Sequence, residues 1–304
     1  MVSKAVIQAL ESMVSKENIH LQEPLSKHTT FRVGGPADCL VEIEDVEQLK
    51  KVKKYLLLTG VDHMLIGNGS NLLAGDGGYR GVILQMGSKM AHIRVEGNTI
   101  IAGAGALLSR VARVALEHGL TGLEFASGIP GSVGGAVVMN AGAYGGEMMQ
   151  IVSAVRVLHP DGEEMLLLNS DMEFGYRTSV IKKHPFAVVE VIMELKPGDP
   201  KAIQSYMEDL AGRRREKQPL EYPSAGSTFK RPEGYFAGEL IMKAGMRGFG
   251  IGGAQVSEKH CGFVINAANA TARDIMSVIT AVQTKVREQF GVDLEPEVIT
   301  FGDF

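Results

Sequence analysis

The chain has little cysteine and no strong excess of either charge. Only two of its 304 residues are cysteines, Cys39 and Cys261, and they lack the close spacing of a metal site. So few cysteines favour a reducing, cytoplasmic setting. The formal net charge of −4 gives no sign of a preference for nucleic acid or a membrane surface. We therefore expect neither kind of partner, and nothing in the sequence indicates an obligate protein partner.

Long apolar runs and metal-type groupings are missing too. No stretch of about 18 apolar residues occurs, so no transmembrane helix is predicted. The first twenty residues contain Glu11 and Glu17, which predicts a short amphipathic helix and not a signal peptide. The eight histidines show no metal-ligand grouping, and His260 is expected to pack or lie at the surface.

Glycine is abundant, with 37 residues, and two glycine-rich segments stand out. Residues 128–146 read GIPGSVGGAVVMNAGAYGG, and residues 67–71 read GNGSN. Glycine loses more backbone entropy on folding than any other residue, so it is kept where the chain turns at positive φ or closely approaches something. Neither segment has the Rossmann spacing or the lysine of a P-loop.

The remaining pattern alternates strands and helices. A strand at 37–43 precedes a helix that Asp45 caps, with Gln48 as its capping-box partner and Gly60 as its end. Further expected elements are strands at 63–66, 81–85, 92–97, 99–106 and 186–195, a helix at 107–119 with Leu107 on its apolar face, a hairpin at 151–168, a helix at about 202–216, a capped helix at 271–291 with Phe290 on its apolar face, and a strand at 294–302. A change of character near residue 197 predicts a domain boundary.

Two interpretations of the glycine segments stay open. They are either tight turns packed beneath a core or backbone anion sites, since consecutive N–H groups can bind an anion without cationic side chains. Ser70, Asn71 and Ser132 add short hydrogen-bond donors. Two such turns, each expected at the end of a strand, favour a pyrophosphate held between them, as an extended dinucleotide such as FAD requires.

Several motifs carry a family resemblance. GNGSNLL, IAGAGA and GLEFASGIPGSVGGAVVMNAGAYG resemble the FAD-binding domain of the vanillyl-alcohol-oxidase (PCMH) type. FGYRTS at 174–179, AGSTFKRP at 225–232 and EPEVI at 295–299 resemble the UDP-N-acetylenolpyruvoylglucosamine reductases, bacterial flavoenzymes of peptidoglycan precursor synthesis. The similarity covers roughly residues 25–301. The stretch between Arg177 and Ser227 is too short for the tyrosine-bearing loop of one subgroup, so the chain resembles the subgroup without it.

The resemblance implies an α+β fold with a two-part FAD-binding domain followed by a smaller α+β substrate-binding domain. The implied divisions are 1–86, completed by a C-terminal strand at 298–304, then 87–197, then 198–297. It also implies non-covalent FAD, NADPH as reductant and a nucleotide-sugar substrate. The implied activity is that of a UDP-N-acetylmuramate dehydrogenase, in which an enolpyruvyl ether becomes a lactyl ether during cell-wall synthesis, a process tied to cell shape and division.

The family's catalytic residues match three positions in this chain. Arg177 matches an arginine that stabilises the developing enolate, because a guanidinium presents a planar fork to a carboxylate. Ser227 matches the general acid that protonates the α carbon after hydride arrives from flavin N5 at the β carbon. Glu297 matches a carboxylate that stabilises or protonates the intermediate. Each also has a structural alternative, namely a surface arginine, a serine that caps a turn and an edge-strand charge.

The implied binding residues are less specific. For FAD they are Gly67, Asn68, Gly69, Ser70, Asn71, Gly128, Gly131, Ser132, Gly134, Gly135 and Arg214, and for the substrate Lys217, Lys230 and Tyr176. A lysine is as readily a solvated surface residue as a diphosphate ligand. Arg231 stands where the family often has asparagine, and Tyr144 either lines the flavin pocket or packs in the core.

Two other classes of function remain open. One is a flavin oxidase of the same fold, which often binds FAD covalently through His or Cys. Neither glycine turn contains such a residue, and an oxidase would leave FGYRTS and AGSTFK unexplained. The other is a non-catalytic flavin-binding module. Such a module would leave unexplained why Arg177, Ser227 and Glu297 occur within sequence motifs that match those of the family.

Overall fold

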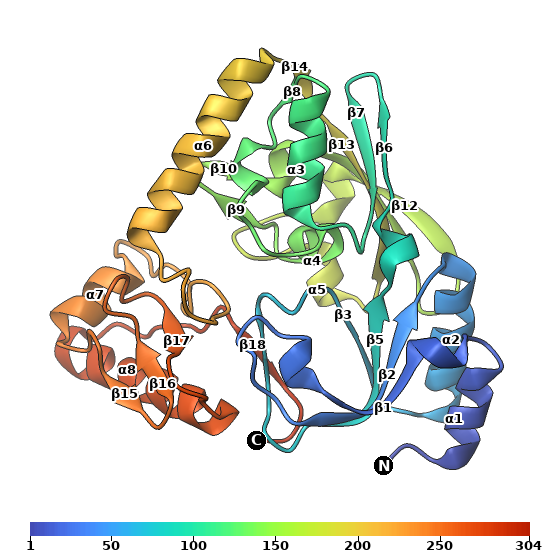
Figure 1. The fold of residues 1–304 in the computed structure, drawn as a ribbon, viewed down its shortest axis with the longest axis horizontal. Coiled ribbons are helices and arrows are strands. Elements are labelled where there is room, and N and C mark those ends of the chain that lie inside the picture. The colour runs from blue at the N-terminus through green and yellow to red at the C-terminus, as the bar shows by residue number, and fades with distance from the viewer. The chain divides into compact units, whose positions relative to one another are not determined.

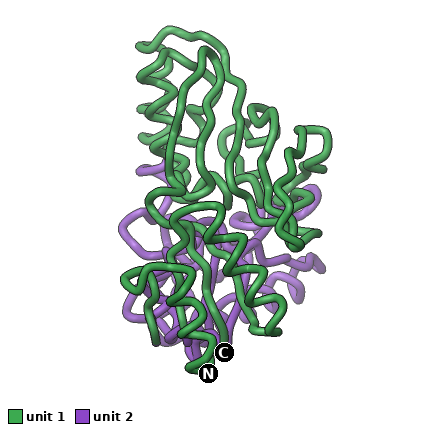
Figure 2. The backbone as a smooth tube through the Cα atoms, turned by 90° about the vertical axis from the view of Figure 1, so that its right-hand side faces the viewer, with its two compact units in different colours: residues 1–21, 39–68, 81–213 green, residues 22–38, 69–80, 214–304 purple.

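The computed structural model describes all of residues 1–304. They contain eight α-helices and eighteen strands, which confirms the α+β class (Figure 1). Contacts group the chain into two units, each assembled from three separate stretches (Figure 2). Unit 1 comprises residues 1–21, 39–68 and 81–213, and unit 2 comprises residues 22–38, 69–80 and 214–304. The expected division into 1–86, 87–197 and 198–297 is a different one and stays a prediction.

A four-stranded sheet begins the fold. Its order is β1 (Ile19–Pro24), β2 (Pro36–Ile43), β5 (Tyr79–Met86) and β3 (His63–Ile66), with β3 parallel to β5. In unit 1, α1 (Lys4–Glu11) and α2 (Val46–Thr59) bury their apolar faces in one core with this sheet. Both expected ends of α2 are confirmed, because Asp45 accepts a bond from the Gln48 N–H and Gly60 has φ 67°. The capping box is not as predicted, since the Gln48 side chain accepts from the Glu44 N–H.

An antiparallel five-stranded sheet forms the second layer of unit 1. Its order is β12 (Glu164–Leu168), β11 (Val152–Leu158), β13 (Ala187–Glu194), β7 (Thr99–Gly103) and β6 (Ile93–Glu96). The hairpin expected at 151–168 is β11–β12. Helices α3 (Leu108–Glu117) and α4 (Val133–Val138) share its core. Leu107 was expected on the apolar face of α3, but it stands before the helix as its N-cap and is exposed.

Shorter elements complete unit 1. They are η1 (Lys16–Asn18), η3 (Ser88–Ala91), β8 (Leu120–Thr121), η4 (Glu124–Ala126), β9 (Gly142–Ala143), β10 (Gly146–Glu147), η5 (Met148–Gln150), η6 (Asn169–Met172), α5 (Val180–Lys183) and β14 (Lys196–Pro197). The charged helix expected at about 202–216 is α6 (Pro200–Lys217). The last boundary between the two units along the chain falls inside this helix, between Arg213 and Arg214.

Unit 2 is built around α8 (Ala272–Phe290). This helix packs on the sheet of β15 (Gly250–Ile251), β16 (Ala254–Val256) and β17 (Val264–Asn266), and beside α7 (Ala237–Lys243) (Figure 1). The predicted capping box of Thr271 and Asp274 is confirmed, and so is the end at Gly291, φ 66°. Phe290, expected on the apolar face, is exposed.

The C-terminus is paired within unit 2. Strand β18 (Ile299–Phe301) lies parallel to β4 (Leu72–Ala74), the strand that follows GNGSN, and η2 (Leu25–Lys27) lies in the same unit. The pairing extends beyond the strands, because the Gly77 N–H donates to the Asp303 carbonyl at 2.8 Å.

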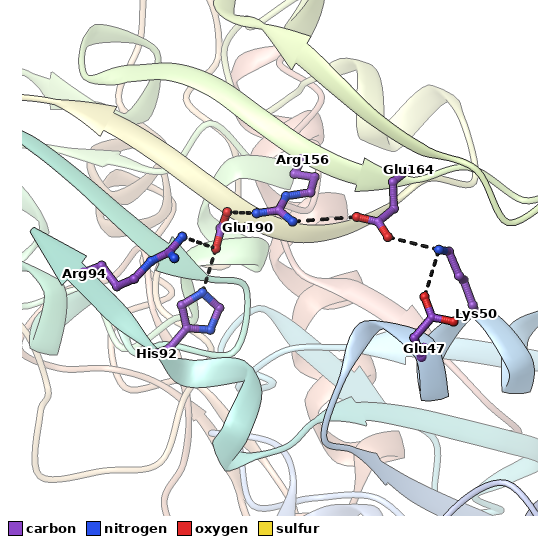
Figure 3. A network of polar contacts seen from close by, with 7 residues as sticks. All are labelled: Glu47, Lys50, His92, Arg94, Arg156, Glu164 and Glu190. Atoms are coloured by element: carbon purple, nitrogen blue, oxygen red, sulfur yellow. Dashed lines mark hydrogen bonds and ion pairs between the residues drawn. The ribbon is translucent and has the colours of Figure 1, made fainter. Parts of the chain in front are cut away.

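A buried carboxylate stands on the five-stranded sheet (Figure 3). Glu190 of β13 is 4% exposed and accepts from His92 at 2.7 Å, from Arg94 at 3.3 Å and from Arg156. Arg156 also pairs with Glu164, which Lys50 of α2 contacts at 3.0 Å. Burial alone would raise the pKa of Glu190, but its bonds to His92 and Arg156 and the charges of Arg156 and Arg94 lower it.

Expectations from the sequence also concerned membrane-spanning helices and the two cysteines. No helix is both long enough and apolar enough to cross a membrane. Cys39 and Cys261 are both buried and unbridged.

Candidate flavin and substrate site

The two glycine segments meet in unit 1. Asn68, at the end of β3, donates from Nδ2 to the carbonyl of Pro130 at 2.5 Å. A Cβ on Gly67 would stand 2.3 Å from Ser132 Oγ, so the two loops touch where Gly67 has no side chain. Asn68, Gly128 and Pro130 are exposed, so the meeting point is open to solvent.

The second segment does not follow a strand, contrary to expectation. It follows η4 and leads into α4, whose first turn Ser132 caps by accepting from the Gly135 N–H at 3.3 Å. One loop therefore ends a strand and the other begins a helix. The N–H groups of the first turn of α4 already have partners, because Val133 donates to the Ala106 carbonyl, Gly134 to the Ala104 carbonyl and Gly135 to Ser132 Oγ.

Two of the glycines have a packing reason of their own. The Gly134 N–H donates to the Ala104 carbonyl at 2.9 Å, and a Cβ on Gly134 would lie 2.9 Å from the Ala104 Cβ. Gly69 has φ 61°, and its Cβ would lie 1.9 Å from the His28 carbonyl oxygen. These positions require glycine whether or not a ligand is present, and their contact with FAD stays a prediction.

The residues at the meeting point fit the flavin dinucleotide that the sequence predicts. A pyrophosphate needs backbone that it can approach closely, and Gly67 presents backbone without a side chain where it meets Ser132. Asn68, Gly128 and Pro130 are exposed at the edge of this contact. Short donors on a side-chain-poor surface suit a phosphate better than an apolar ligand.

Arg177 stands in a tight turn of unit 1. Gly175 and Thr178 exchange two backbone hydrogen bonds, of 3.1 and 3.3 Å, and the turn between them consists of Tyr176 and Arg177. Arg177 has φ 56°, which is rare for a residue with a side chain. Its Nη2 donates to the Gly142 carbonyl at 3.4 Å, and its guanidinium lies 5.2 Å from the centre of the exposed Tyr176 ring.

Asn140 is a residue of this site that the sequence did not single out. Its side chain is fully buried, and Nδ2 donates to the Gly175 carbonyl at 3.1 Å and to Glu147 at 3.0 Å. Its Oδ1 accepts from the Met149 N–H at 2.9 Å. The only available signal was its place two residues before GAYG, because an asparagine near glycine often indicates a turn.

Ser227 and Glu297 come from segments that pair in unit 2. Phe229 and Pro296 form an antiparallel bridge, and the Glu297 N–H donates to the Thr228 carbonyl at 2.8 Å. Thr228 is fully buried, and its hydroxyl accepts from the Val264 N–H, which fixes the segment that carries the exposed Ser227. The register thus places Glu297 opposite the neighbour of Ser227.

Asn71 joins the first glycine turn to this pair. Its Nδ2 donates to the Glu297 carbonyl at 3.0 Å, and its own carbonyl accepts from the Ile299 N–H at 3.0 Å. Gly226 has φ 74°, with nothing within 4 Å of its Cβ position, so the space beside Ser227 is open. The side chain of Asn71 therefore has a structural role, and its contact with FAD stays a prediction.

The cationic candidates differ in their surroundings. Lys230 is partly buried and pairs with the exposed Glu295, and their backbones pair as well. Lys217 is exposed at the end of α6, and Arg214 is partly buried one turn earlier. Arg231 lies over the exposed Phe236 ring at 4.0 Å. Their ligand contacts stay predictions.

Two aromatic-type candidates are also placed. Tyr144 has φ 53° and is 39% exposed, so its ring is not enclosed in a core. His260 packs edge-on against Phe263 at 5.0 Å, and burial lowers its pKa, which agrees with the packing role expected from the sequence. No group of His, Cys, Asp or Glu suited to a metal ion occurs in residues 1–304.

The fold and the glycine site define a flavin-binding protein of the vanillyl-alcohol-oxidase type. Residues 37–167 match an FAD binding domain. The grass pollen allergen Phl p 4, which has glucose dehydrogenase activity, shares the fold at a TM-score of 0.51 and 14% identity, over 64% of this chain and 44% of its own. At that identity the likeness concerns the fold alone.

The chain belongs to the UDP-N-acetylenolpyruvoylglucosamine reductase family. Residues 218–301 match the C-terminal domain of that reductase. The reductase of Clostridium botulinum is 50% identical over 300 residues, covering 99% of this chain and 98% of the relative. The reductase of Caldanaerobacter subterraneus is 46% identical over 302 residues, covering 99% and 100%. The crystal structure of the Thermus caldophilus reductase has a TM-score of 0.80 at 34% identity, covering 93% and 98%.

Proposed function

We propose that this chain reduces UDP-N-acetylenolpyruvoylglucosamine to UDP-N-acetylmuramate, with NADPH as the reductant and non-covalent FAD as the cofactor. The observation that carries the proposal is the full-length likeness to named reductases, 50% identity over 300 residues. The described geometry supports it, because the motifs that contain Ser227 and Glu297 pair in one unit and Arg177 is held in a defined turn. The cytoplasmic location expected from the sequence stays a prediction.

The bound flavin would supply hydride to the β carbon of the enolpyruvyl double bond. Electron density then moves toward the substrate carboxylate, and we assign Arg177 to that carboxylate because a guanidinium offers two parallel donors. Ser227 gives its hydroxyl proton to the α carbon, which completes the lactyl ether. Glu297 is proposed to stabilise the intermediate or to assist the return of a proton to Ser227.

The nucleotide part of the substrate calls for cationic partners. We assign Lys217 and Lys230 to the diphosphate, since an ammonium group binds phosphate as a point charge, and Tyr176 to the substrate as well. Glu295 now neutralises Lys230, so binding of the diphosphate would require Lys230 to exchange or share that partner. Gly67, Asn68, Gly69, Ser70, Asn71, Gly128, Gly131, Ser132, Gly134, Gly135 and Arg214 are proposed for FAD.

A visible spectrum combined with NADPH consumption tests this function. We expect a flavin spectrum, and NADPH oxidation that depends on the enolpyruvyl nucleotide sugar and yields its lactyl product. Oxygen consumption with an alcohol or sugar would instead indicate an oxidase. A flavin spectrum without turnover of either substrate would indicate a binding module.

A further inference from the structure

We propose that Asn140 is a positioning residue for Arg177, and that it acts through the carbonyl oxygen of Gly175. This inference rests on the role of Arg177 proposed above and adds a residue to it. Asn140 is fully buried, and burial of its amide costs free energy unless hydrogen bonds compensate for the lost water, so the groups that it bonds hold it in place.

The bonds of Asn140 connect the Arg177 turn to a rigid support. Nδ2 holds the Gly175 carbonyl at 3.1 Å, the same oxygen that accepts the Thr178 N–H and closes the turn. The second Nδ2 bond goes to Glu147 and the Oδ1 bond to the Met149 N–H, so the amide itself is fixed at three points. Movement of Gly175 would therefore move Arg177 directly.

The guanidinium end of Arg177 contacts the same loop. Its Nη2 donates to the carbonyl of Gly142, two residues after Asn140 in the chain. The backbone and the side chain of Arg177 are thus both held by one segment, the end of the glycine-rich stretch. This is the arrangement needed to hold a fork-shaped donor at a fixed angle to a carboxylate.

Backbone strain at both positions agrees with a functional constraint. Asn140 has φ 42° and Arg177 has φ 56°, and such conformations persist only where surrounding contacts enforce them. A second buried anchor follows the turn, because the Ser179 hydroxyl donates to the Val138 carbonyl at 2.9 Å. The turn is therefore held on both sides by the segment around α4.

An amide–carboxyl exchange tests the bond to Gly175 separately from stability. In Asn140→Asp/Glu147→Gln, the new glutamine can donate to the new aspartate, and the aspartate can still accept from the Met149 N–H. Only the Gly175 carbonyl loses the side-chain donor that Asn140 gave it. We expect the melting temperature to fall by no more than about 4 °C, the shift typical of about 1 kcal/mol in a domain of this size.

The catalytic readout is the pair of half-reactions, followed by stopped flow. We expect flavin reduction by NADPH to stay unchanged and reoxidation by the enolpyruvyl substrate to fall by roughly 10–100-fold, because small misplacements of a binding group cost that much. Asn169→Asp is the matched control. It removes an amide that donates to the Met149 and Val152 carbonyls in the same unit, and it should leave both rates unchanged.

A double-mutant cycle decides whether Asn140 acts through Arg177. Added to Arg177→Ala, the Asn140 and Glu147 changes should cause no further loss of reoxidation rate. The positioning role is overturned if these changes slow reoxidation as much in Arg177→Ala as they do in the parent protein. Normal reoxidation in the exchange variant alone also overturns it. If Arg177→Ala alone reoxidises normally, the proposed role of Arg177 fails, and the inference fails with it.

Product binding supplies a readout that does not depend on turnover. Titration with UDP-N-acetylmuramate should show weakening in the exchange variant, a larger weakening in Arg177→Ala, and unchanged affinity in Asn169→Asp. If the exchange variant does not fold, Asn140→Gly replaces it, because glycine adopts the positive φ without strain. Parent-like affinity and reoxidation in that variant would overturn the proposal.

Discussion

Asn68 Nδ2 lies 2.5 Å from the carbonyl oxygen of Pro130, and this bond joins two glycine-rich loops that are 62 residues apart in the chain. The sequence suggested a pyrophosphate between these loops, and the structure brings the two loops into contact within unit 1. A ligand that uses both loops gains affinity where they are held in place beforehand, because less entropy is then lost on binding.

The first prediction concerns the flavin. Gly67→Ala should lower flavin content and affinity, because its methyl group would lie 2.3 Å from Ser132 Oγ, and the hydroxyl would leave the Gly135 N–H or the loops would separate. In Gly67→Ala/Ser132→Ala the nearest remaining atom is the residue 132 Cβ at 3.4 Å, an ordinary contact, so binding should largely recover to that of Ser132→Ala. The ratio of flavin to protein absorbance measures this. Equal flavin loss in the single and double variants would contradict the steric explanation.

Acid precipitation tests the mode of flavin attachment. All of the flavin should appear in the supernatant, since non-covalent FAD is expected. Colour that stays with the pellet would contradict this. Gly69→Val is a poor probe of the cofactor, because its Cβ would strike the His28 carbonyl and disturb the fold first.

The second prediction concerns Arg177. Arg177→Ala should slow flavin reoxidation by the enolpyruvyl substrate about 10²–10³-fold, the usual effect of losing one charge-stabilising donor. Flavin reduction by NADPH should change far less. Arg177→Lys keeps the charge but loses the fork, and we expect only partial recovery. Equal losses in both half-reactions would indicate a general defect in binding or folding.

The third prediction concerns Ser227. Ser227→Ala should still fold, bind FAD and be reduced by NADPH, whereas reoxidation by substrate should fall about 10²–10⁴-fold, because the proton donor is gone. Ser224→Ala makes the same change three residues earlier in the loop and should reoxidise like the parent. Stopped-flow absorbance at the flavin band separates the two steps. Normal reoxidation in Ser227→Ala would assign this serine a purely structural role.

The fourth prediction concerns Glu190 and pH. Its pKa is lower in the folded chain than its ordinary value, so it stabilises the fold when deprotonated. That contribution is complete above the ordinary pKa and is lost as the pH falls through the lower folded value. The free energy of unfolding in urea, followed by circular dichroism between about pH 6 and pH 3, should therefore depend less steeply on pH in Glu190→Gln than in the parent.

A control separates Glu190 from other carboxylates. Glu96 is exposed on β6 of the same sheet, and Glu96→Gln should leave the pH dependence close to that of the parent. An unchanged slope in Glu190→Gln would show that His92, Arg94 and Arg156 do not hold this carboxylate ionised.

Local signals in the sequence predicted much of the fold. The caps at Asp45 and Thr271 and the ends at Gly60 and Gly291 depend on residues within one turn of each other, so they could be read directly. The turn of the β11–β12 hairpin is equally local. Exposure of Phe290 could not be read, because helical spacing defines a face but not how far the neighbouring elements extend along it.

Long-range partners explain what the sequence did not reveal. Whether a glycine serves a ligand or a packing contact depends on residues such as His28 and Ala104, which are remote from Gly69 and Gly134 in the chain. The position of Asn140 beside the Arg177 turn likewise depends on Gly175, which is remote from it in the chain. The motifs containing Arg177, Ser227 and Glu297 were identified by family resemblance, and their roles are still to be tested.

The pairing of β4 with β18 has a consequence for the order of events during synthesis. β4 follows GNGSN early in the chain, but its strand partner, Ile299–Phe301, is synthesised more than 220 residues later. Every residue of unit 1 up to Arg213 has been made by then. The contact of Asn71 with Glu297 and the closure of β4 can therefore form only once residues 297–301 have been synthesised, and a nascent chain that stops before Ile299 leaves β4 without its strand neighbour.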